Sequence, residues 1–536
     1  MTKRWFSVNA GVALVALVGT TLSAQQPTIP GQQQQPVATA PLTQMPAVDK
    51  YVVGAAKPPE VPGAPSIDLS LDDAIAISLE KNLDLQVQKL NPAIQDYNLV
   101  RLNAVFRPTL TSSFQQNHSS TPSTNTLDGV ATDITQRQNY SAGYSQNLPW
   151  QGGAFSATFS SGRTGNNVVT NTHNPSFTAA TNFNYTQPLL MGRTIDSNRN
   201  AIRVQEITRQ ITDITLLAAI ENTKANVRTA YWALRQAIEA IEINNRALIL
   251  ANQLLENDKV QLQIGTMAGI DLAQPEVAVA SSMQQLVNAK ITWQQAELAL
   301  KRLLVNGKDD DLYRRTINPT EQALLGAEPT VNIDGAVQSA LANRTDIQTA
   351  KKGIDSSVLS LEVTKNQVMP SLNLSAGYTM NGQGGPSLQQ GVLTPGGYFN
   401  ALSALTSNPG WNVGLNFSYP LGLSSARASL SSAQLQLDQS KAQLKVTELT
   451  VATDVTQAGL NVQNSYQSYL AAKAASDAQQ TATDAEQTKL NVGVSNSYNV
   501  VQQQNALTAA RLTELRALIT YINAVADFEK KQRIGS

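Results

Sequence analysis

One long segment of this sequence occurs twice. Residues 71–110, which begin Leu71-Asp72-Asp73, reappear as residues 333–372, which begin Ile333-Asp334-Gly335. The copies stay in register without a gap, so Leu79, Asp84 and Pro108 correspond to Leu341, Asp346 and Pro370. A duplication of this size predicts a pseudo-symmetric body of two halves, and it argues against a short-period solenoid.

In each copy the sequence period changes from helical to strand-like after a proline. Residues 411–419 place Trp, Val, Leu, Phe and Tyr on one face and Asn, Gly, Asn and Ser on the other. Residues 372–380 and 177–187 alternate in the same way. One apolar face and one small, uncharged polar face are typical of a membrane β-barrel, and strands of about 9–11 residues suit a tilted crossing. The polar connections 118–137, 163–175 and 381–409 are expected to be loops.

The first half holds additional alternating residues. Tyr140, Ala142 and Tyr144 alternate before a turn at residues 148–153, and Phe155, Ala157 and Phe159 alternate after it. This pattern predicts an extra hairpin over residues 139–161. The hairpin either enlarges the barrel or folds over its mouth, and the sequence leaves both possibilities open.

Two very long helices follow the strands. They are expected at about residues 196–264 and 424–492, and each would be about 100 Å long at ~1.5 Å per residue. In the first, apolar residues spaced four and three apart predict a coiled-coil seam. The seam consists of Val227, Tyr231, Leu234, Ile238, Ile241, Asn245, Leu248, Asn252 and Leu255. Gly265 and Gly493 end the long helices, and return helices are expected at 271–304 and 499–531.

The remaining helices and the connecting segments complete the prediction. A helix that precedes the first strands should run from Asp72 to about Phe106, because the residue before Pro108 disfavours helix. Residues 306–332 are polar and predicted to be an irregular linker between the repeats. We therefore expect a first repeat at 67–305, with strands at about 109–187, and a second repeat at 333–533, with strands at about 371–419.

The N-terminal residues have the pattern of an exported protein. Lys3 and Arg4 precede an apolar run, and Leu22-Ser23-Ala24 is a small-residue cleavage site, which predicts a signal peptide at residues 1–24. A retained membrane anchor is the alternative, but the run is shorter than the ~20 residues that a spanning helix needs. Residues 25–66 are rich in Pro and Gln, so we expect a disordered lead or a strap along the outside.

The composition offers little for catalysis or metal binding. The chain has no cysteine, which excludes disulfides and thiolate metal sites. Lys plus Arg and Asp plus Glu both number 39, so net charge gives no indication of nucleic acid as a partner. Both histidines, His118 and His173, are predicted in loops, and Asp309-Asp310-Asp311 is predicted as a solvated turn. Gly382 to Gly385 is predicted as a mobile loop. We therefore predict no enzyme activity, cofactor or metal site.

Several short motifs carry a family resemblance. They are the junction Gln187-Pro188-Leu189, the pair Tyr231-Trp232, the reversal Gly265…Asp271-Leu272-Ala273-Gln274 and the reversal Gly493…Gln502-Gln503-Gln504-Asn505-Ala506-Leu507. Together with the doubled order of helix, strands and long hairpin, they resemble the TolC family of outer-membrane efflux ducts. The resemblance covers about residues 67–533.

The resemblance implies a fold, an assembly and a location. The fold would be mainly α with a membrane β-barrel portion, built from a duplicated helix, strand and long helical hairpin unit. Homotrimers of this family usually share a 12-stranded barrel, with four strands from each protomer. The barrel lies in the bacterial outer membrane lipid, and the hairpins form a tunnel across the periplasm. The partners would be a periplasmic adaptor and an inner-membrane RND, ABC or MFS transporter.

The resemblance also indicates candidate sites at the two helical reversals. Small residues at family tips imply that Gly265, Gly269, Gly493 and Ser495 contact the adaptor. Some relatives narrow the periplasmic entrance with acidic rings, but this chain has Asn499 and Gln502 after the second reversal, and only Asp271 is acidic. Our hypothesis is that Asp271 and Asn499 form hydrogen bonds with neighbouring hairpins and hold the entrance shut.

These observations predict an outer-membrane exit duct of a tripartite efflux system that passively conducts substrates from the periplasm to the exterior. Type I protein secretion uses similar ducts and stays open as an alternative. A soluble periplasmic coiled-coil scaffold is an alternative of another class, although it would not need strands with an aromatic face. A porin would be nearly all strand, whereas this chain ends in a predicted helix.

Overall fold

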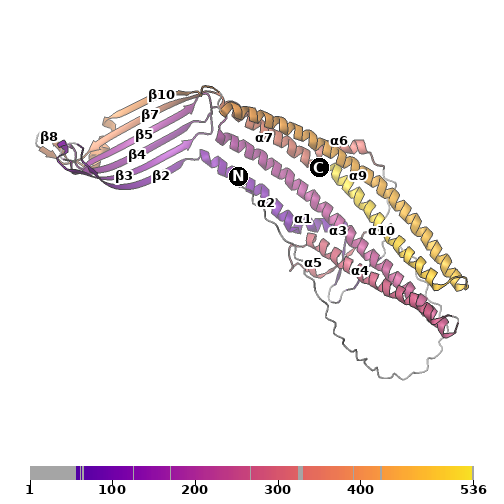
Figure 1. Cartoon of the computed structure of the whole chain (residues 1–536). Coiled ribbons are helices and arrows are strands. Elements are labelled where there is room, and N and C mark those ends of the chain that lie inside the picture. Colours follow the sequence, from indigo (N-terminus) through magenta and orange to yellow (C-terminus); the bar gives the residue numbers. More distant parts are fainter. Residues whose placement is uncertain are drawn as a thin grey trace, which may run out of the picture. The chain divides into compact units, whose positions relative to one another are not determined.

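The fold contains two copies of a unit in which helices lead into strands and then into a long helical hairpin, as the duplication predicts (Figure 1). The computed structural model describes residues 56–533, apart from 61, 63–64, 125, 169–170, 266, 324–329, 390–391 and 423–424. The predicted signal peptide, residues 1–24, and most of the predicted lead, residues 25–66, lie outside the described residues. Everything below belongs to one unit, residues 51–536.

The first repeat has four helices and four strands in its main elements. They are α1 (Leu71–Lys81), α2 (Leu83–Asn103), β2 (Thr109–Pro122), β3 (Thr132–Asn147), β4 (Ala154–Asn166), β5 (Ser176–Pro188), α3 (Ser197–Gln263) and α4 (Ala273–Leu304). The second repeat has the same helices but two long strands. They are α6 (Ile333–Asn343), α7 (Thr345–Gln367), β7 (Ser371–Gly384), β10 (Pro409–Ser418), α9 (Ser425–Asn491) and α10 (Ser497–Arg533). The predicted long helices and return helices are confirmed to within two residues at each end.

The helix predicted from Asp72 to Phe106 is broken, and that prediction is wrong. Asn82 is extended and separates α1 from α2, and its Oδ1 accepts a hydrogen bond of 2.9 Å from the Leu85 amide at the start of α2. Its Nδ2 donates to the carbonyl oxygen of Leu303 on α4. Arg344 makes the same break between α6 and α7. The Asn82 side chain caps the start of α2, whereas Arg344 makes its break without a side-chain cap.

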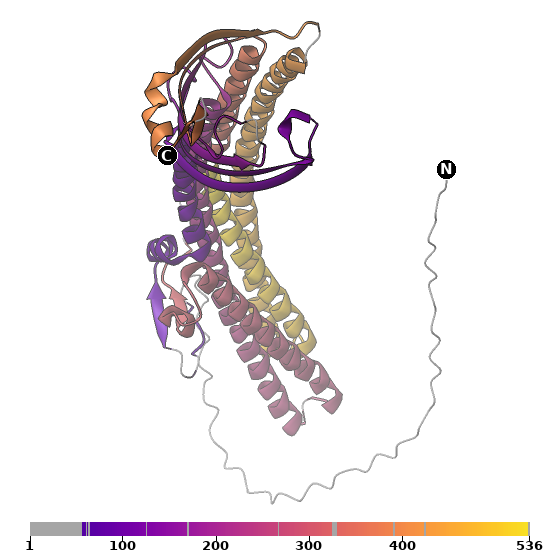
Figure 2. The same cartoon turned by 90° about the vertical axis from the view of Figure 1, so that its left-hand side faces the viewer.

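The long strands form one antiparallel sheet of six, in the order β10-β7-β5-β4-β3-β2. The strands of the extra hairpin, β3 and β4, lie within this sheet and pair with β2 and β5. The sequence leaves open whether each protomer has four or six such strands, and the sheet of this chain has six. The strands join the helices at one end, which we call the helix-side end, and the sheet is curved, as Figure 2 shows.

The register separates two chemically different faces of the sheet. Side chains in one row, for example Leu110, Tyr144, Phe183, Tyr378 and Trp411, face one another across the strands. This aromatic face also carries Phe114, Tyr140, Phe155, Phe159, Phe177, Tyr185, Leu372, Leu374, Val413, Leu415 and Phe417. The opposite polar face carries Thr111, Ser113, Ser141, Thr158, Ser160, Asn182, Asn184, Asn373, Ser375, Asn412 and Asn416. The alternation predicted for residues 177–187, 372–380 and 411–419 is thus confirmed.

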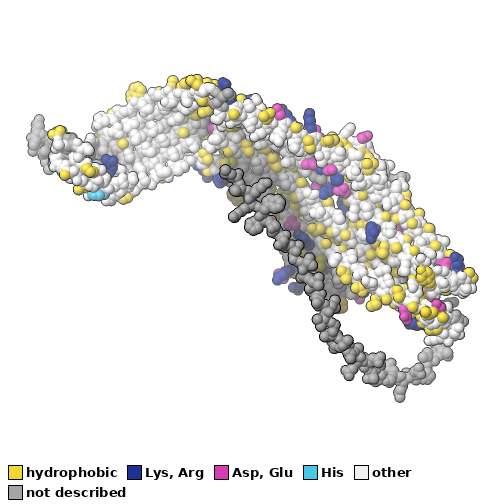
Figure 3. All heavy atoms as spheres, viewed as in Figure 1, with side chains coloured by type: hydrophobic (Ala, Val, Ile, Leu, Met, Phe, Trp, Pro, Cys, Tyr) yellow, Lys and Arg dark blue, Asp and Glu magenta, His cyan; other side chains and the backbone are white. Residues whose placement is uncertain are grey.

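Charge is nearly absent from the sheet. The only Asp, Glu, Lys or Arg residues in the six strands are Asp133, Arg137 and Arg163, and all three lie toward the ends far from the helices. In Figure 3 the charged side chains on the visible face gather over the helices, while the sheet is mostly uncharged. In the helix-side part of the sheet, lipid can therefore contact the aromatic face.

The connection from β7 to β10 folds onto the aromatic face. It contains β8 (Ser387–Gln389), β9 (Val392–Thr394) and the short helix α8 (Tyr398–Ser403). The Tyr398 ring lies 4.5 Å from that of Phe177, centroid to centroid. A Cβ at Gly382 would lie 1.9 Å from the carbonyl oxygen of Ala401. The prediction of a mobile glycine loop is wrong here, because Gly382 and Gly384 belong to β7 and allow α8 to approach closely.

The helices pack around the predicted seam of α3 only along part of its length. Val227, Tyr231, Leu234, Ile238 and Ile241 are buried, as predicted. After Ile241 the predicted seam residue Leu255 is buried, but the other buried residues include Asn244, Ala251, Leu254 and Asp258, which lie outside the predicted seam. Asn245 and Asn252 are not buried, and Asn252 bonds instead to the Leu248 carbonyl of its own helix. The prediction that these two asparagines lie in the seam is wrong.

The linker between the repeats is partly regular. It contains α5 (Asp311–Arg314) and β6 (Thr316–Pro319), and β6 pairs in parallel with β1 (Ser66–Leu69). Asp310 forms an ion pair of 2.9 Å with Lys81, which lowers the pKa of the Asp310 carboxyl. Asp310 of the predicted acidic turn is therefore paired with a lysine on α1.

Two further predictions concern the histidines and the membrane. His118 lies in β2 rather than in a loop, whereas His173 lies between β4 and β5. Among the residues that the structure describes, no helix is long and apolar enough to cross a membrane.

Candidate functional site

The first helical hairpin ends in a glycine turn with exposed apolar side chains. Gly265 follows α3 with a φ of 80°, a conformation that favours glycine, and no described residue other than its chain neighbours has an atom within 4 Å of where its Cβ would be. Gly269 begins a short 3-10 helix (Gly269–Leu272) and is equally open. Beside these glycines, the side chains of Ile264 and Ile270 are 67% and 82% exposed. This tip therefore presents an apolar surface that the fold itself leaves uncovered.

The second hairpin ends in a similar turn that is stabilised by a polar network. Gly493 has a φ of 77°, and its neighbours Val492 and Val494 are exposed. Ser495 donates a hydrogen bond to the Glu486 carboxylate on α9 and accepts one from Asn499 Nδ2. The Ser495 hydroxyl, followed by the Lys489 ammonium, lowers the pKa of the Glu486 carboxyl. Ser495 thus stabilises the turn in which it lies.

The two hairpins meet at a buried carboxylate near their tips. Asp258, in the last turns of α3, accepts a hydrogen bond of 2.8 Å from the hydroxyl of Ser497, the first residue of α10. Asp258 is fully buried, and the loss of hydration raises the pKa of its carboxyl despite the Ser497 hydrogen bond. Next to it, Leu254 and Ala278 of the first hairpin pack with Val500 and Val501 of the second. Each hairpin therefore fixes the position of the other near the tips.

The three predicted entrance residues lie at the starts of the return helices. Asp271 is exposed in the 3-10 turn before α4. Asn499 and Gln502 are exposed on the first turns of α10. The structure places Asn499 against Ser495 of its own hairpin, and contacts with a neighbouring copy stay a prediction.

Sequence reasoning selected the glycines at the tips and missed the apolar residues beside them and the buried Asp258. Ile264, Ile270, Val494 and Tyr498 are all more than half exposed. The sequence contains a signal for these apolar residues, because large apolar side chains beside the glycines that end a helix have no neighbouring helical turn to pack against. No sequence signal marks Asp258, because its burial depends on how the two hairpins meet.

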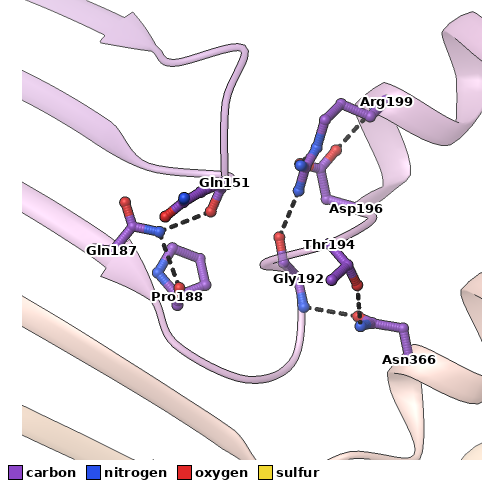
Figure 4. Close-up of polar contacts among 8 residues, drawn as sticks. All are labelled: Gln151, Gln187, Pro188, Gly192, Thr194, Asp196, Arg199 and Asn366. Atoms are coloured by element: carbon purple, nitrogen blue, oxygen red, sulfur yellow. Dashed lines mark hydrogen bonds and ion pairs between the residues drawn. The ribbon is translucent and has the colours of Figure 1, made fainter.

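The junction between sheet and helices is a second polar site (Figure 4). At the end of β5, Gln187 Nε2 donates to the carbonyl oxygen of Gln151, in the turn between β3 and β4, at 2.7 Å. The amide of Gly192 donates to Oδ1 of Asn366, at the end of α7, also at 2.7 Å. Asn366 Nδ2 donates to Thr194 Oγ1. The two bonds of Asn366 join the first repeat to the second where strand becomes helix.

An ion pair begins the long helix that leaves this junction. Asp196 caps α3 by accepting from the Arg199 amide at 2.8 Å, and its other carboxylate oxygen pairs with Arg199 Nε at 2.7 Å. Arg199 also donates to the Gly192 carbonyl oxygen. The turn 189–196 is therefore held at both ends, so the direction in which α3 leaves the sheet is fixed.

The residues of these sites can contact a partner or hold the backbone in position. Within the described part of the chain, no cluster of three or more His, Cys, Asp or Glu side chains could hold a metal ion. Of the predicted site residues, the first tip holds Gly265, Gly269 and Asp271, and the second holds Gly493, Ser495, Asn499 and Gln502, where Ser495 and Asn499 share a hydrogen bond.

Comparison with known proteins identifies the family. The family model described as "Outer membrane efflux protein" matches residues 136–306 and 336–530, well over half of the chain. Comparison with curated protein sequences gives no match.

Solved structures share the fold. The Campylobacter jejuni CmeC outer membrane channel aligns with a TM-score of 0.64 at 16% identity and covers 87% of this chain and 86% of its own. CusC gives 0.62 at 17% identity, covering 92% and 99%. The open state of the Neisseria gonorrhoeae MtrE outer membrane channel gives 0.59 at 18% identity, covering 91% and 98%.

The family match confirms the resemblance, the predicted fold class and the location in the bacterial outer membrane. The two-faced sheet and the paired helical hairpins are the parts of an exit duct for efflux. The chain belongs to the outer membrane efflux protein family, a family of transport ducts and not of enzymes.

Proposed function

We propose that this chain acts as a homotrimer and forms the exit duct of a tripartite efflux system. A periplasmic adaptor would bind the hairpin tips, and an inner-membrane RND, ABC or MFS transporter would supply the energy. The duct itself would conduct substrates without chemistry of its own. The predicted signal peptide, residues 1–24, would direct the chain to export.

One observation carries the proposal. A sheet with an aromatic face and a mostly uncharged polar face continues directly into two helical hairpins, since β5 leads into α3 and β10 leads into α9. Lipid suits the aromatic face, and water suits the polar face. A soluble scaffold has no use for exposed Trp411, Val413 and Leu415 in one row. The proposal therefore accounts for both parts of the chain together.

The adaptor surface is proposed at the two tips. It comprises the predicted residues Gly265, Gly269, Gly493 and Ser495, and we add the exposed side chains of Ile264, Ile270, Val494 and Tyr498. Apolar side chains that no residue of the chain covers gain free energy when a partner buries them. The small tip residues let a partner helix approach closely.

The periplasmic entrance is proposed at Asp271, Asn499 and Gln502, where the return helices begin. These side chains are exposed and polar, so a neighbouring copy can bond to them when the entrance is closed. With only one acidic residue per chain among them, cation block of the entrance should be weak.

The test is deletion of the gene followed by complementation in the source bacterium. We expect the deletion strain to gain sensitivity to drugs or solvents, and the full-length chain to restore resistance from the outer-membrane fraction. Normal drug sensitivity together with a lost secreted protein would favour type I secretion instead. Recovery of the chain only in the soluble periplasmic fraction would favour the scaffold and contradict the proposal.

A further inference from the structure

Among the residues that the structure describes, the sheet leaves two edges without a partner strand. β2 is one edge and β10 the other. All fourteen residues of β2 are exposed, and nine of the ten residues of β10 are exposed. Large apolar side chains on both strands are uncovered, including Leu110 at 81% and Trp411 at 79%. Each edge also presents a row of backbone N–H and C=O groups.

Lipid cannot satisfy these backbone groups. Within a bilayer every N–H and C=O must find a partner in the protein, so a membrane sheet has to close. Six strands are too few for a closed membrane barrel, since the smallest have about eight. The two edges must therefore meet edges of other copies of this chain.

The directions of the two edge strands suit such a contact. β2 runs from α2 away from the helix-side end, and β10 runs back to the helix-side end before α9. Copies that stand side by side in one membrane therefore place β2 of one copy antiparallel to β10 of the next. This continues the antiparallel order found inside each sheet.

The two faces of the sheet restrict the register of that contact. Even-numbered residues of β2, such as Ser112, lie on the aromatic face, and odd-numbered residues, such as Ser113, lie on the polar face. On β10 the parity is reversed, because Trp411 and Leu415 belong to the aromatic face. Each face is continuous only when even positions of β2 lie opposite odd positions of β10.

The β3–β4 hairpin is a fixed part of the sheet. It pairs with β2 on one side and with β5 on the other. Its turn is bonded to the junction, because Gln187 donates to the Gln151 carbonyl oxygen. The fit is close, since a Cβ at Gly152 would lie 2.5 Å from the Gly192 carbonyl oxygen. The hairpin therefore lies between the other strands and adds to the circumference of any barrel.

We propose that three copies close one 18-stranded barrel from their three six-stranded sheets. At each joint between two sheets, β2 of one copy pairs with β10 of the next. The inference rests on the proposed trimer and adds the strand number, the joining edges and the role of the hairpin. Barrel diameter grows roughly linearly with strand number, so this barrel is ~1.5 times as wide as one made from four-stranded sheets. Its lumen is lined mostly by Ser, Thr and Asn, with one Asp133 and one Arg137 per copy on the same face toward the end far from the helices, so it passes bulky polar solutes with little net charge selection.

Disulfide trapping tests the joining edges, and the chain offers a background without cysteine. Ser113→Cys is combined in turn with cysteine at the polar-face positions of β10, namely Asn412, Gly414, Asn416 and Ser418. Each double variant is expressed in the outer membrane, oxidised and examined by denaturing electrophoresis. At least one should form disulfide-linked dimers and trimers. Ser112→Cys, the adjacent serine on the opposite face, is the matched control and should give none with the same partners.

Electron cryomicroscopy of the detergent-extracted full-length protein counts the strands directly. Eighteen strands in one ring, with β3 and β4 among them, is the expected result. A trimer that restores efflux but has a 12-stranded ring, with the hairpin outside it, overturns this inference and leaves the proposed function intact. Trimers that form no Ser113 cross-link with any β10 position also overturn it. Failure to form trimers or to reach the membrane contradicts the proposed function as well.

Discussion

Ser497 donates a hydrogen bond of 2.8 Å to Asp258, and this bond joins the beginning of α10 to the end of α3. The two residues belong to different hairpins, so the bond lies where the hairpins would separate if the periplasmic end opened. The surrounding side chains of Leu254, Ala278, Val500 and Val501 exclude water from it. The contact is therefore sensitive to the protonation of one carboxyl group.

Asp258 should make the hairpin contact weaker as the pH rises. Its folded-state pKa is raised, because burial disfavours the charged form. A raised acid pKa means that the folded state binds more protons, so stability falls as pH increases from the unfolded pKa through the folded pKa. We expect Asp258→Asn to raise the thermal midpoint at pH 7.5, with a gain that shrinks toward pH 4.

The control for this prediction is Asp438→Asn, which removes an exposed carboxylate from α9. Thermal unfolding of the purified protein across that pH range should show little change for the control. A gain for Asp258→Asn that is the same at every pH, or a loss at pH 7.5, would contradict the assignment.

The strands and long helices could be predicted because their patterns are local. Alternation along β10 and the glycines at Gly265 and Gly493 depend only on neighbouring residues. The six-stranded order could not be predicted, because whether β3 and β4 join the sheet depends on contacts such as Gln187 with Gln151, far apart in sequence.

The errors of sequence reasoning have the same physical origin. Asn82 caps the start of a new helix with its own side chain, although the apolar period continues past it. Asn244 and Asn245 are the same residue type, so the sequence does not distinguish them. The packing of α10 and α4 against α3 decides which of the two is buried. At the tips, glycine spacing indicated the turn correctly, but exposure of Ile270 is visible only once the hairpin is folded.

Ile270 should matter for efflux and hardly at all for folding. Its side chain is 82% exposed, so replacing it changes little in the free energy of unfolding. We expect Ile270→Asp to reduce drug resistance in the complemented strain by at least fourfold, because a charge disrupts an apolar contact with the adaptor. Ile270→Leu is the matched control and should retain resistance. Equal resistance for both variants at equal outer-membrane levels would exclude this tip as the adaptor surface.

Asn366 should stabilise the junction between the repeats. The side chain is buried and accepts from the Gly192 amide, so Asn366→Ala leaves that donor without its partner and should cost about 1–3 kcal/mol. Thr194→Val removes only the longer bond, of 3.2 Å, which the exposed Thr194 hydroxyl accepts from Asn366 Nδ2. This change should cost less than about 0.5 kcal/mol. Chemical denaturation of the purified protein compares the two. Equal losses would show that the Gly192 bond has no special role.

Asp271 should help to keep the periplasmic entrance closed. If its carboxylate bonds to a neighbouring hairpin in the trimer, Asp271→Ala removes that bond and the single-channel conductance in a planar bilayer should rise. Asp484→Ala, an exposed acid on α9, is the control and should leave the conductance unchanged. An unchanged closed level for Asp271→Ala would refute the entrance assignment.

The most direct test of the whole account is the accessibility of single cysteines on two adjacent residues of β10, Leu415 and Asn416. The protein is labelled in intact outer membranes with a charged, membrane-impermeant thiol reagent. The account predicts that Asn416→Cys reacts because it faces the aqueous lumen, whereas Leu415→Cys is protected because it faces lipid. Equal labelling of both positions, or labelling of Leu415→Cys alone, would contradict the assignment of the sheet to a membrane conduit.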